Sequence, residues 1–283
     1  MISGLPIRIG SCIGGGSFEK YAELFKEMGY ESLSVNFHMS YGDTNLEELA
    51  EKTKGILPIS GIGLYCNPLQ YEEHFHNLER FIDLAEKFGT NLVTTFAGAL
   101  EGQSVEASMP QFKKVFGELT KRAEDRGVRI AIENCPMGGS WYHCTCNIGF
   151  NPMAWDMMFN EVTSDALGLE WEPAHQMHQL IDPIAVLRKY AGKVYHLHGK
   201  DAQVRHDLIR TQGICGPKPA VISRVPGCGD CDWREIMGIL LESGIENEPI
   251  TISVENEDSV LGGDRYLLGQ QIAVNYLKQC RGV

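Results

Sequence analysis

Short apolar segments alternate with longer amphipathic segments along the whole chain. The short segments show the two-residue period of β-strands: in TISVEN, Ile252 and Val254 share one face, whereas Glu255 lies on the other. Longer segments, such as 78–89 (LERFIDLAEKFG), have the apolar spacing of a helix that packs on a sheet, and a glycine marks their end. The pattern therefore predicts strands and helices in alternation.

The alternation repeats eight times. The predicted strands span 7–11, 32–37, 62–66, 92–96, 129–134, 167–171, 194–198 and 251–255, and the predicted helices lie near 17–28, 44–56, 71–88, 108–126, 151–161, 181–190, 232–243 and 263–281. We therefore predict an α/β fold, a single (β/α)8 TIM barrel domain with a closed parallel sheet over residues 1–283. A doubly wound open sheet is the alternative, but the glycines of GSCIGGGS (10–17) lack the spacing of a phosphate-binding loop.

Composition narrows the function classes. With 43% hydrophobic and 22% charged residues, the chain resembles ordinary globular proteins, and its formal charge of −12 makes it a poor partner for nucleic acid. No apolar run is long enough to span a membrane. The segment MISGLPIRIG lacks the basic and apolar regions of a secretory signal, so we expect a cytoplasmic protein whose nine cysteines are reduced.

Four predicted strands end in acidic or histidine side chains, within AIENCP (131–136), LEWEPAH (169–175), HLHGKD (196–201) and SVENED (253–258). Catalytic groups of barrel enzymes lie at the C-terminal ends of strands, and converging carboxylates need a cation or a proton to offset their repulsion. We therefore predict a metal site formed by Glu133, Glu172, His198 and Glu255. This donor set suits one Mn²⁺, Mg²⁺ or Co²⁺ ion, with Zn²⁺ as a further candidate.

Each of these residues also has a simpler explanation. A single glutamate is more often part of a surface ion pair, and only the four together at equivalent strand ends favour a metal. For His196, a histidine packed in the barrel core is as good an explanation as a metal ligand. For His198, a metal ligand is the better explanation. The pairs Cys144/Cys146 and Cys228/Cys231 lie in two insertions, 135–152 and 202–231, and we interpret them mainly as incidental thiols, with a second zinc site as the alternative.

The motifs IENCPMGG (132–139), EPAH (172–175), HLHGKDA (196–202), VPGCGDCDW (225–233) and ISVENED (252–258) resemble those of the xylose-isomerase-like barrel superfamily. This group holds sugar isomerases, epimerases and related lyases. The resemblance implies Glu133, Glu172, His198 and Glu255 as metal ligands and His175 as a substrate contact. One departure is that the second ligand is usually aspartate; the extra methylene of Glu172 moves its carboxylate by roughly 1.5 Å.

The resemblance and the chemistry together predict a metal-dependent isomerase or epimerase of a carbohydrate. Glu133 and Glu255 would move the proton, and Lys200, His175 and Arg205 would hold substrate oxygens. Trp141 is expected to stack on the sugar. One of the three histidines His38, His74 and His76 is expected to touch it as well.

Three alternatives stay open: a lyase or dehydratase of keto-sugars or keto-inositols on the same metal, a sugar-binding barrel without catalysis, and a phosphodiesterase of the endonuclease-four type. The last needs more histidines and a basic track, which the net charge disfavours. Neither a nucleic-acid partner nor a membrane is expected, and a homo-oligomer is an open alternative to a monomer.

Overall fold

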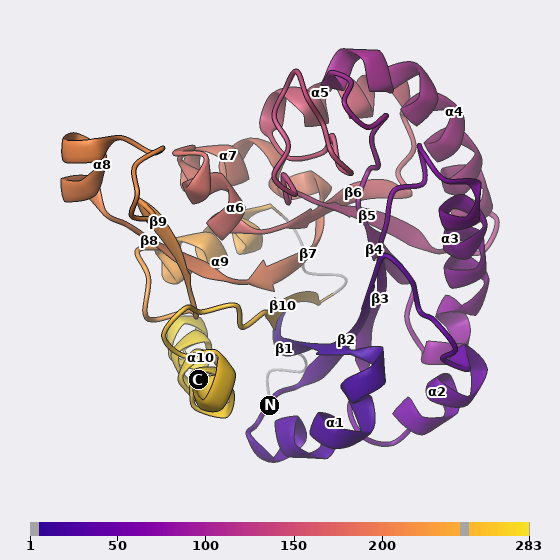
Figure 1. Cartoon of the computed structure of the whole chain (residues 1–283). Helices are drawn as coiled ribbons and strands as arrows, with labels where there is room; N and C mark the ends of the chain where they lie inside the picture. Colours follow the sequence, from indigo (N-terminus) through magenta and orange to yellow (C-terminus); the bar gives the residue numbers. More distant parts are fainter. Residues whose placement is uncertain (1–5, 244–248, 283) are drawn as a thin grey trace.

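The computed structural model describes residues 6–243 and 249–282. Within these residues, eight parallel strands close into a barrel in the order β1-β10-β7-β6-β5-β4-β3-β2 (Figure 1). The barrel strands are β1 Ile7–Gly14, β2 Ser32–His38, β3 Ile59–Tyr65, β4 Leu92–Thr95, β5 Arg129–Glu133, β6 Leu167–Trp171, β7 Val194–Gly199 and β10 Ile250–Val254. Closure confirms the predicted (β/α)8 fold and excludes the doubly wound open sheet.

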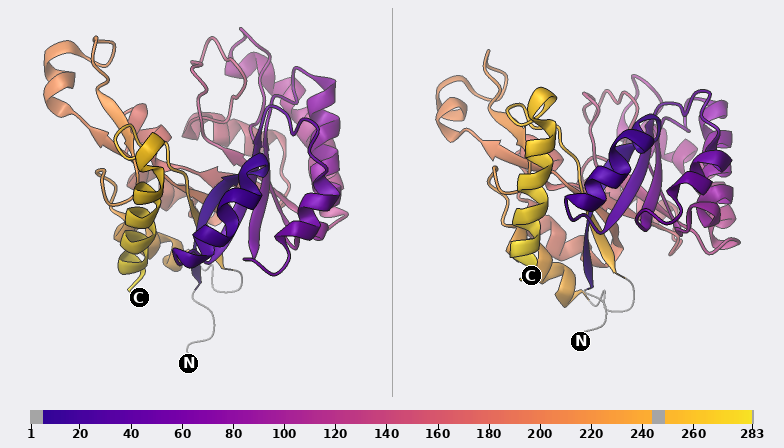
Figure 2. Two further views of the ribbon diagram at one scale, coloured as in Figure 1. Left: turned by 60° about the horizontal axis from the view of Figure 1, so that its bottom comes forward. Right: turned by 90° about the horizontal axis from the view of Figure 1, so that it is seen from below.

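Helices surround the barrel, as Figures 1 and 2 show from several sides. The described α-helices, of which all but α8 lie around the barrel, are α1 Phe18–Glu27, α2 Leu46–Thr53, α3 Glu72–Leu84, α4 Val105–Glu124, α5 Pro152–Glu161, α6 Pro173–His178, α7 Pro183–Tyr190, α8 His206–Gln212, α9 Trp233–Glu242 and α10 Tyr266–Arg281. Several begin at side-chain caps; Asn45, Ser104 and Asn151, for example, accept a hydrogen bond from a backbone N–H of the first helical turn. No described helix is long and apolar enough to cross a bilayer.

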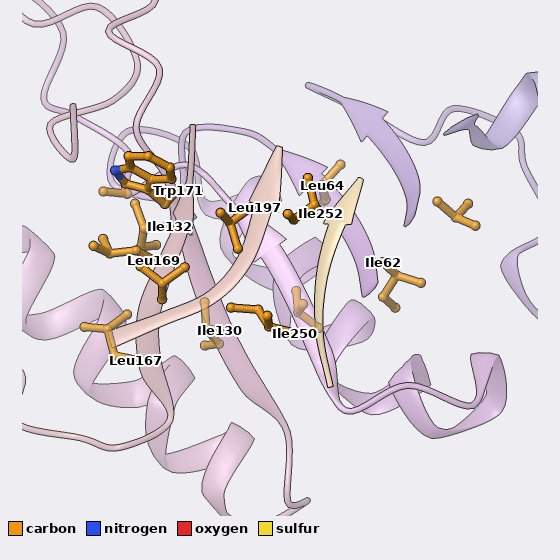
Figure 3. Packing of buried hydrophobic residues seen from close by; sticks show 14 of the residues in the cluster. Ile62, Leu64, Ile130, Ile132, Leu167, Leu169, Trp171, Leu197, Ile250 and Ile252 are labelled. Atoms are coloured by element: carbon orange, nitrogen blue, oxygen red, sulfur yellow. The ribbon is translucent and has the colours of Figure 1, made fainter. Parts of the chain in front are cut away.

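The two faces of the barrel strands differ in chemistry. Figure 3 shows the apolar face, on which buried side chains of neighbouring strands pack together; those labelled are Ile62, Leu64, Ile130, Ile132, Leu167, Leu169, Trp171, Leu197, Ile250 and Ile252. Because side chains alternate along a strand, the residues between them point into the barrel. The apolar face therefore packs against the surrounding helices, and the side chains of the alternate residues fill the barrel interior.

The barrel interior is polar. Barrels are usually filled by layers of branched apolar side chains, but here the Oγ of Ser34 donates to Asn36 at 3.0 Å, and the hydroxyls of Tyr65 and Thr94 lie 3.0 Å apart. A Cβ added to Gly63 would lie 2.6 Å from the side-chain oxygen of Asn36 and 2.7 Å from that of Thr94. Glycine at this position therefore makes room for polar groups that meet inside the barrel.

Some predicted boundaries were wrong. The third strand begins at Ile59 instead of residue 62, because it pairs with β2 from Leu33 onward across a register shift. The predicted helix 71–88 is α3 followed by a 3₁₀ turn, Ala85–Phe88, which ends at Gly89 with φ of 72°. The short helix α6, directly after Glu172, was not predicted.

The two insertions fold differently. In the first, buried Asn147 donates to the backbone carbonyls of Glu133 and Cys135 at 2.9 and 2.8 Å, which fixes the insertion against the end of β5. The second contains an antiparallel hairpin of β8 Asp201–Val204 and β9 Val221–Arg224, with α8 at its outer end. This helix has no buried residue, and it projects away from the barrel (Figure 1).

Candidate metal centre

Four predicted ligands meet at the C-terminal ends of their strands. Glu133 is the last residue of β5, Glu172 follows β6, His198 lies near the end of β7, and Glu255 follows β10. One ligand atom from each lies within 4.8 Å of all the others. The ring nitrogen Nδ1 of His198 is central, because carboxylate oxygens of Glu133, Glu172 and Glu255 lie 3.0, 3.4 and 3.6 Å from it.

The carboxylate of Glu172 is buried without a hydrogen bond to either oxygen among the described residues. Its nearest side-chain nitrogens are His175 Nε2 at 3.2 Å, and Lys200 Nζ and His198 Nδ1 at 3.4 Å each. The backbone of Glu172 is instead held firmly by Asn134, which accepts from its N–H at 2.7 Å and donates to its carbonyl at 2.9 Å. The longer side chain at this position therefore still reaches the cluster, and its oxygens remain available to a ligand.

Burial and like charge shape the electrostatics of the cluster. Burial raises the pKa of Glu133 to about 7 and that of Glu172 to about 8, although His198 and Lys200 partly oppose this. Burial alone would also raise the pKa of Glu255, but Lys200 and His198 hold it well below its ordinary value. Such a group of buried carboxylates lowers its energy by gaining a cation.

Lys200 already supplies one cation at the edge of the cluster. Its buried ammonium lies 3.1 Å from Glu255 and 2.5 Å from Glu257, in addition to its contact with Glu172. Burial would lower the pKa of Lys200, but these carboxylates raise it well above its ordinary value. His175 is held neutral in contrast, because burial lowers its pKa well below the ordinary value.

A second polar group lies deeper in the barrel, beneath His198. Glu170 contacts His196 Nδ1 at 2.7 Å and His198 Nε2 at 3.1 Å, and its other oxygen accepts the hydroxyl of Tyr65 at 2.7 Å. The second nitrogen of His196 lies 3.0 Å from the hydroxyl of Ser253. His196 is thus a packed, fully hydrogen-bonded histidine, and His198 is the one that faces the cluster.

The other predicted substrate contacts lie further from the cluster. Trp141, in the first insertion, donates from its indole nitrogen to Glu106 of α4 at 2.6 Å. Arg205, in the second insertion, donates to the carbonyl of Pro219 at 3.4 Å. Among the described residues, these hydrogen bonds are made to partners outside the four-residue cluster.

Of the three uncertain histidines, His38 lies at the end of β2 with its ring 6.1 Å from that of Phe96, which neighbours Tyr65. His76 pairs with Glu79 on the surface of α3, and the ring of His74 accepts the N–H of Asn67 at 3.1 Å. His38 is therefore the histidine of this set that lies at the C-terminal end of a barrel strand, where it is exposed to solvent.

The cysteine pairs are not brought into one group. Within the described residues, the candidate metal-binding groups contain glutamate and histidine but no cysteine. Cys144 contacts the carbonyl of Ser140 at 3.4 Å, and Cys231 packs against the sulfur of Met177 at 3.2 Å. Tyr65 was not predicted as a site residue, although Gly61, Gly63 and Tyr65 share one face of β3 by alternation and so point to the interior.

A family model described as the xylose isomerase-like TIM barrel matches residues 22–279, so the chain belongs to this family, as the motifs predicted. An uncharacterized protein of Bacillus subtilis, YfiH, is 28% identical over 190 residues, 64% of this chain and 54% of YfiH. An inosose dehydratase of Clostridium beijerinckii is 25% identical over 171 residues, 58% of this chain and 52% of the dehydratase. These matches span about half the length of the curated relatives.

The fold is shared with solved structures at low sequence identity. An L-ribulose 3-epimerase superimposes with a TM-score of 0.70 and 15% identity, covering 97% of this chain and 96% of the epimerase. At this identity the likeness concerns the fold.

Proposed function

We propose that this protein is a divalent-metal-dependent enzyme that isomerises or epimerises a keto-sugar or a related polyol through an enediolate. The observation that carries the proposal is the convergence of Glu133, Glu172, His198 and Glu255 within 4.8 Å at the C-terminal end of the barrel. That end is where the active sites of TIM-barrel enzymes lie.

Two properties of the residues fit a metal ion: the type of their donor atoms, and the lack of hydrogen bonds to the Glu172 oxygens among the described residues. Three carboxylates and one imidazole suit Mn²⁺, Mg²⁺ or Co²⁺, with Zn²⁺ as a further candidate. The Glu172 oxygens are buried without a hydrogen bond, an arrangement that is costly unless a cation is bound. When bound, such a cation would polarise a substrate carbonyl and the neighbouring hydroxyl and acidify the C–H bond between them.

The proton transfers fall to Glu133 and Glu255. These residues approach His198 from β5 and from the end of β10, strands that are separated in the barrel by β6 and β7. One carboxylate accepts the proton from the substrate carbon, and the other returns a proton. Return to the opposite face of the same carbon gives an epimer, and return to the neighbouring carbon gives an isomer.

Lys200 and His175 would hold the substrate. Both contact Glu172, so a sugar oxygen next to the carboxylates lies within reach of an ammonium donor and an imidazole. The ammonium would offset the charge that develops on the enediolate oxygen. Arg205 and Trp141 remain proposed outer contacts. The proposed substrate is a small carbohydrate, and we propose a cytoplasmic enzyme.

A second candidate is a dehydratase of keto-sugars or keto-inositols. It is favoured by the match to two inosose dehydratases, at 25% and 26% identity. The first step is the same removal of a proton beside a carbonyl; the hydroxyl group on the next carbon then takes up a proton and leaves as water, while the electrons of the enolate form a C=C bond. A product that has lost water would identify this reaction, whereas an isomer keeps the mass of its substrate.

The test uses Glu133→Gln and Glu255→Gln with Mn²⁺ in excess. Both variants lose a carboxylate, so we expect weaker metal binding and, at full occupancy, a loss of turnover of about 10²–10⁴-fold. The measurement is exchange of the substrate's carbon-bound hydrogen with deuterated solvent, together with product formation from a panel of keto-sugars and keto-inositols.

Glu161→Gln, which alters an exposed glutamate on α5 paired with Lys113, is the control and should behave as the wild type. Normal exchange and turnover in both site variants, at full metal occupancy, would contradict the proposed roles of Glu133 and Glu255.

A further inference from the structure

We infer that Glu170 is a positioning residue, which holds the Nε2 side of His198 so that Nδ1 points at the cluster of Glu133, Glu172 and Glu255. The inference rests on the proposed metal site. It adds a residue that lies outside the four proposed ligands, on β6 and two positions before Glu172.

The contacts of Glu170 fix the direction of the imidazole. One carboxylate oxygen lies 3.1 Å from His198 Nε2, and the cluster lies on the other side of the ring, 3.0–3.6 Å from Nδ1. An ionised carboxylate can only accept hydrogen bonds, so the contact with Glu170 places a proton on Nε2. An imidazole that gave up its other proton to bind a metal would then have its lone pair on Nδ1, the nitrogen that faces the carboxylates of the proposed metal site.

Glu170 is itself held by partners that cannot easily move. His196 contacts it at 2.7 Å and is anchored on its other nitrogen by Ser253 at 3.0 Å. Tyr65 donates to it at 2.7 Å, with a hydroxyl that also meets Thr94 and a ring packed on Phe96 at a centroid distance of 5.3 Å. The carboxylate is thus restrained from several sides and transmits that restraint to His198.

The same contacts argue against two other roles for Glu170. Donor atoms of Glu170, His196 and His198 lie within 4.8 Å of one another, as a second metal would need. Both oxygens of Glu170 and both nitrogens of His196 already have partners, in contrast to Glu172. The imidazole of His198 also stands between Glu170 and the cluster, which places Glu170 behind a ligand and away from a substrate bound there.

The test compares Glu170→Gln and Glu172→Gln with the wild type, with Zn²⁺ alone as the probe. Competition with a chelator gives the metal dissociation constant, and nitrogen-15 spectra of labelled histidine report which ring nitrogen of His198 carries the proton. We expect Glu170→Gln to weaken Zn²⁺ binding by about 10–100-fold. A glutamine can present either an N–H or an oxygen to the ring, so the spectrum should also lose the single Nε2-protonated form.

Glu31→Gln is the matched control, because Glu31 is a carboxylate paired with Arg281 at the opposite end of the barrel. It should leave both readouts unchanged. Tyr65→Phe removes one hydrogen-bond donor to Glu170 and keeps the ring, so it should weaken Zn²⁺ binding severalfold. If Glu170→Gln does not fold, this variant provides the test in its place.

The outcomes separate the two proposals. If Glu172→Gln loses Zn²⁺ but the variants at Glu170 and Tyr65 bind within twofold of the wild type with an unchanged His198 spectrum, Glu170 is not a positioning residue and the metal site stands. If Glu172→Gln also binds Zn²⁺ as the wild type does, the proposed metal site itself is wrong, and the inference about Glu170 is overturned with it.

Discussion

Glu170 and Glu172 lie two residues apart at the end of the same strand, and both are fully buried, yet their surroundings are opposite. Glu170 accepts from Tyr65 and contacts two imidazoles, whereas neither oxygen of Glu172 has a hydrogen bond within the described structure. Burial tends to raise the pKa of both. In Glu170 the histidines reverse the shift and lower its pKa to about 2, while the pKa of Glu172 rises to about 8.

We interpret the difference as that between a carboxylate that stabilises the fold and one that is kept for the proposed metal. A buried charge with its partners in place is compensated at all times. A buried carboxylate without hydrogen bonds is a local cost that the folded chain must offset elsewhere, and such costs are common where a site awaits its ligand. The comparison therefore predicts opposite responses when each carboxylate is replaced by an apolar side chain.

The largest effect is expected for Glu170→Leu. The substitution leaves His196 Nδ1 and His198 Nε2 buried without the carboxylate that both contact, and it removes one hydrogen-bond acceptor of Tyr65. Removal of one member of a buried, paired group costs about 3–5 kcal/mol in the free energy of unfolding. Urea denaturation with a chelator present measures it as a lower midpoint at unchanged slope. A loss below about 1 kcal/mol would show that the network contributes little.

A much smaller effect, or a gain, is expected for Glu172→Leu under the same metal-free conditions. The substitution removes a carboxylate that has no hydrogen bond, and Lys200 keeps Glu255 and Glu257 as partners. We expect a change within about 1 kcal/mol of the wild type or a higher stability. With Zn²⁺ at 100 times the dissociation constant, the wild type should gain about 2.7 kcal/mol, a gain that the variant lacks. Equal losses for the two leucine variants would abolish the contrast.

The sequence was sufficient to predict the barrel, because strand and helix periods alternate clearly and each strand has one apolar face. It could not predict where β3 begins, since that depends on a register shift against β2. Nor could it show that the first insertion is tied to β5 through Asn147 while α8 projects from the second. Such differences arise from contacts between segments distant along the chain.

The candidate site was also predicted from the alternation of side chains along strands, and here too contacts between distant segments could not be predicted. Alternation placed Glu133, Glu172, His198 and Glu255 at strand ends, and the structure brings them together. Alternation places residues 170 and 172 on the same face, so it cannot reveal that Glu170 accepts a hydrogen bond from Tyr65 of β3 while Glu172 has no such donor among the described residues. The roles of His196 and His198 likewise depend on which partner each nitrogen meets.

A third carboxylate, Glu31, extends the comparison to a group paired with a permanent cation. Its two oxygens contact the guanidinium of Arg281 at 2.7 Å each, and one also accepts the N–H of Ile9 at 2.9 Å. Burial would raise the pKa of Glu31, but the hydrogen bonds and charge of Arg281 and the N–H of Ile9 lower it below the ordinary 4.5. The ionised form is therefore favoured by folding.

A modest effect that depends on pH is expected from this pair. Because the pKa of Glu31 is lowered in the folded state, its contribution to stability is present above the unfolded pKa and is lost as the pH falls through the folded pKa. Glu31→Gln should cost on the order of 1 kcal/mol at pH 7, since the pair is partly exposed to solvent. Urea titrations of both proteins at pH 7 and pH 3 should show the difference shrinking at the lower pH. A difference that is the same at both values would mean that packing of the side chain, and not its charge, accounts for the contribution of Glu31.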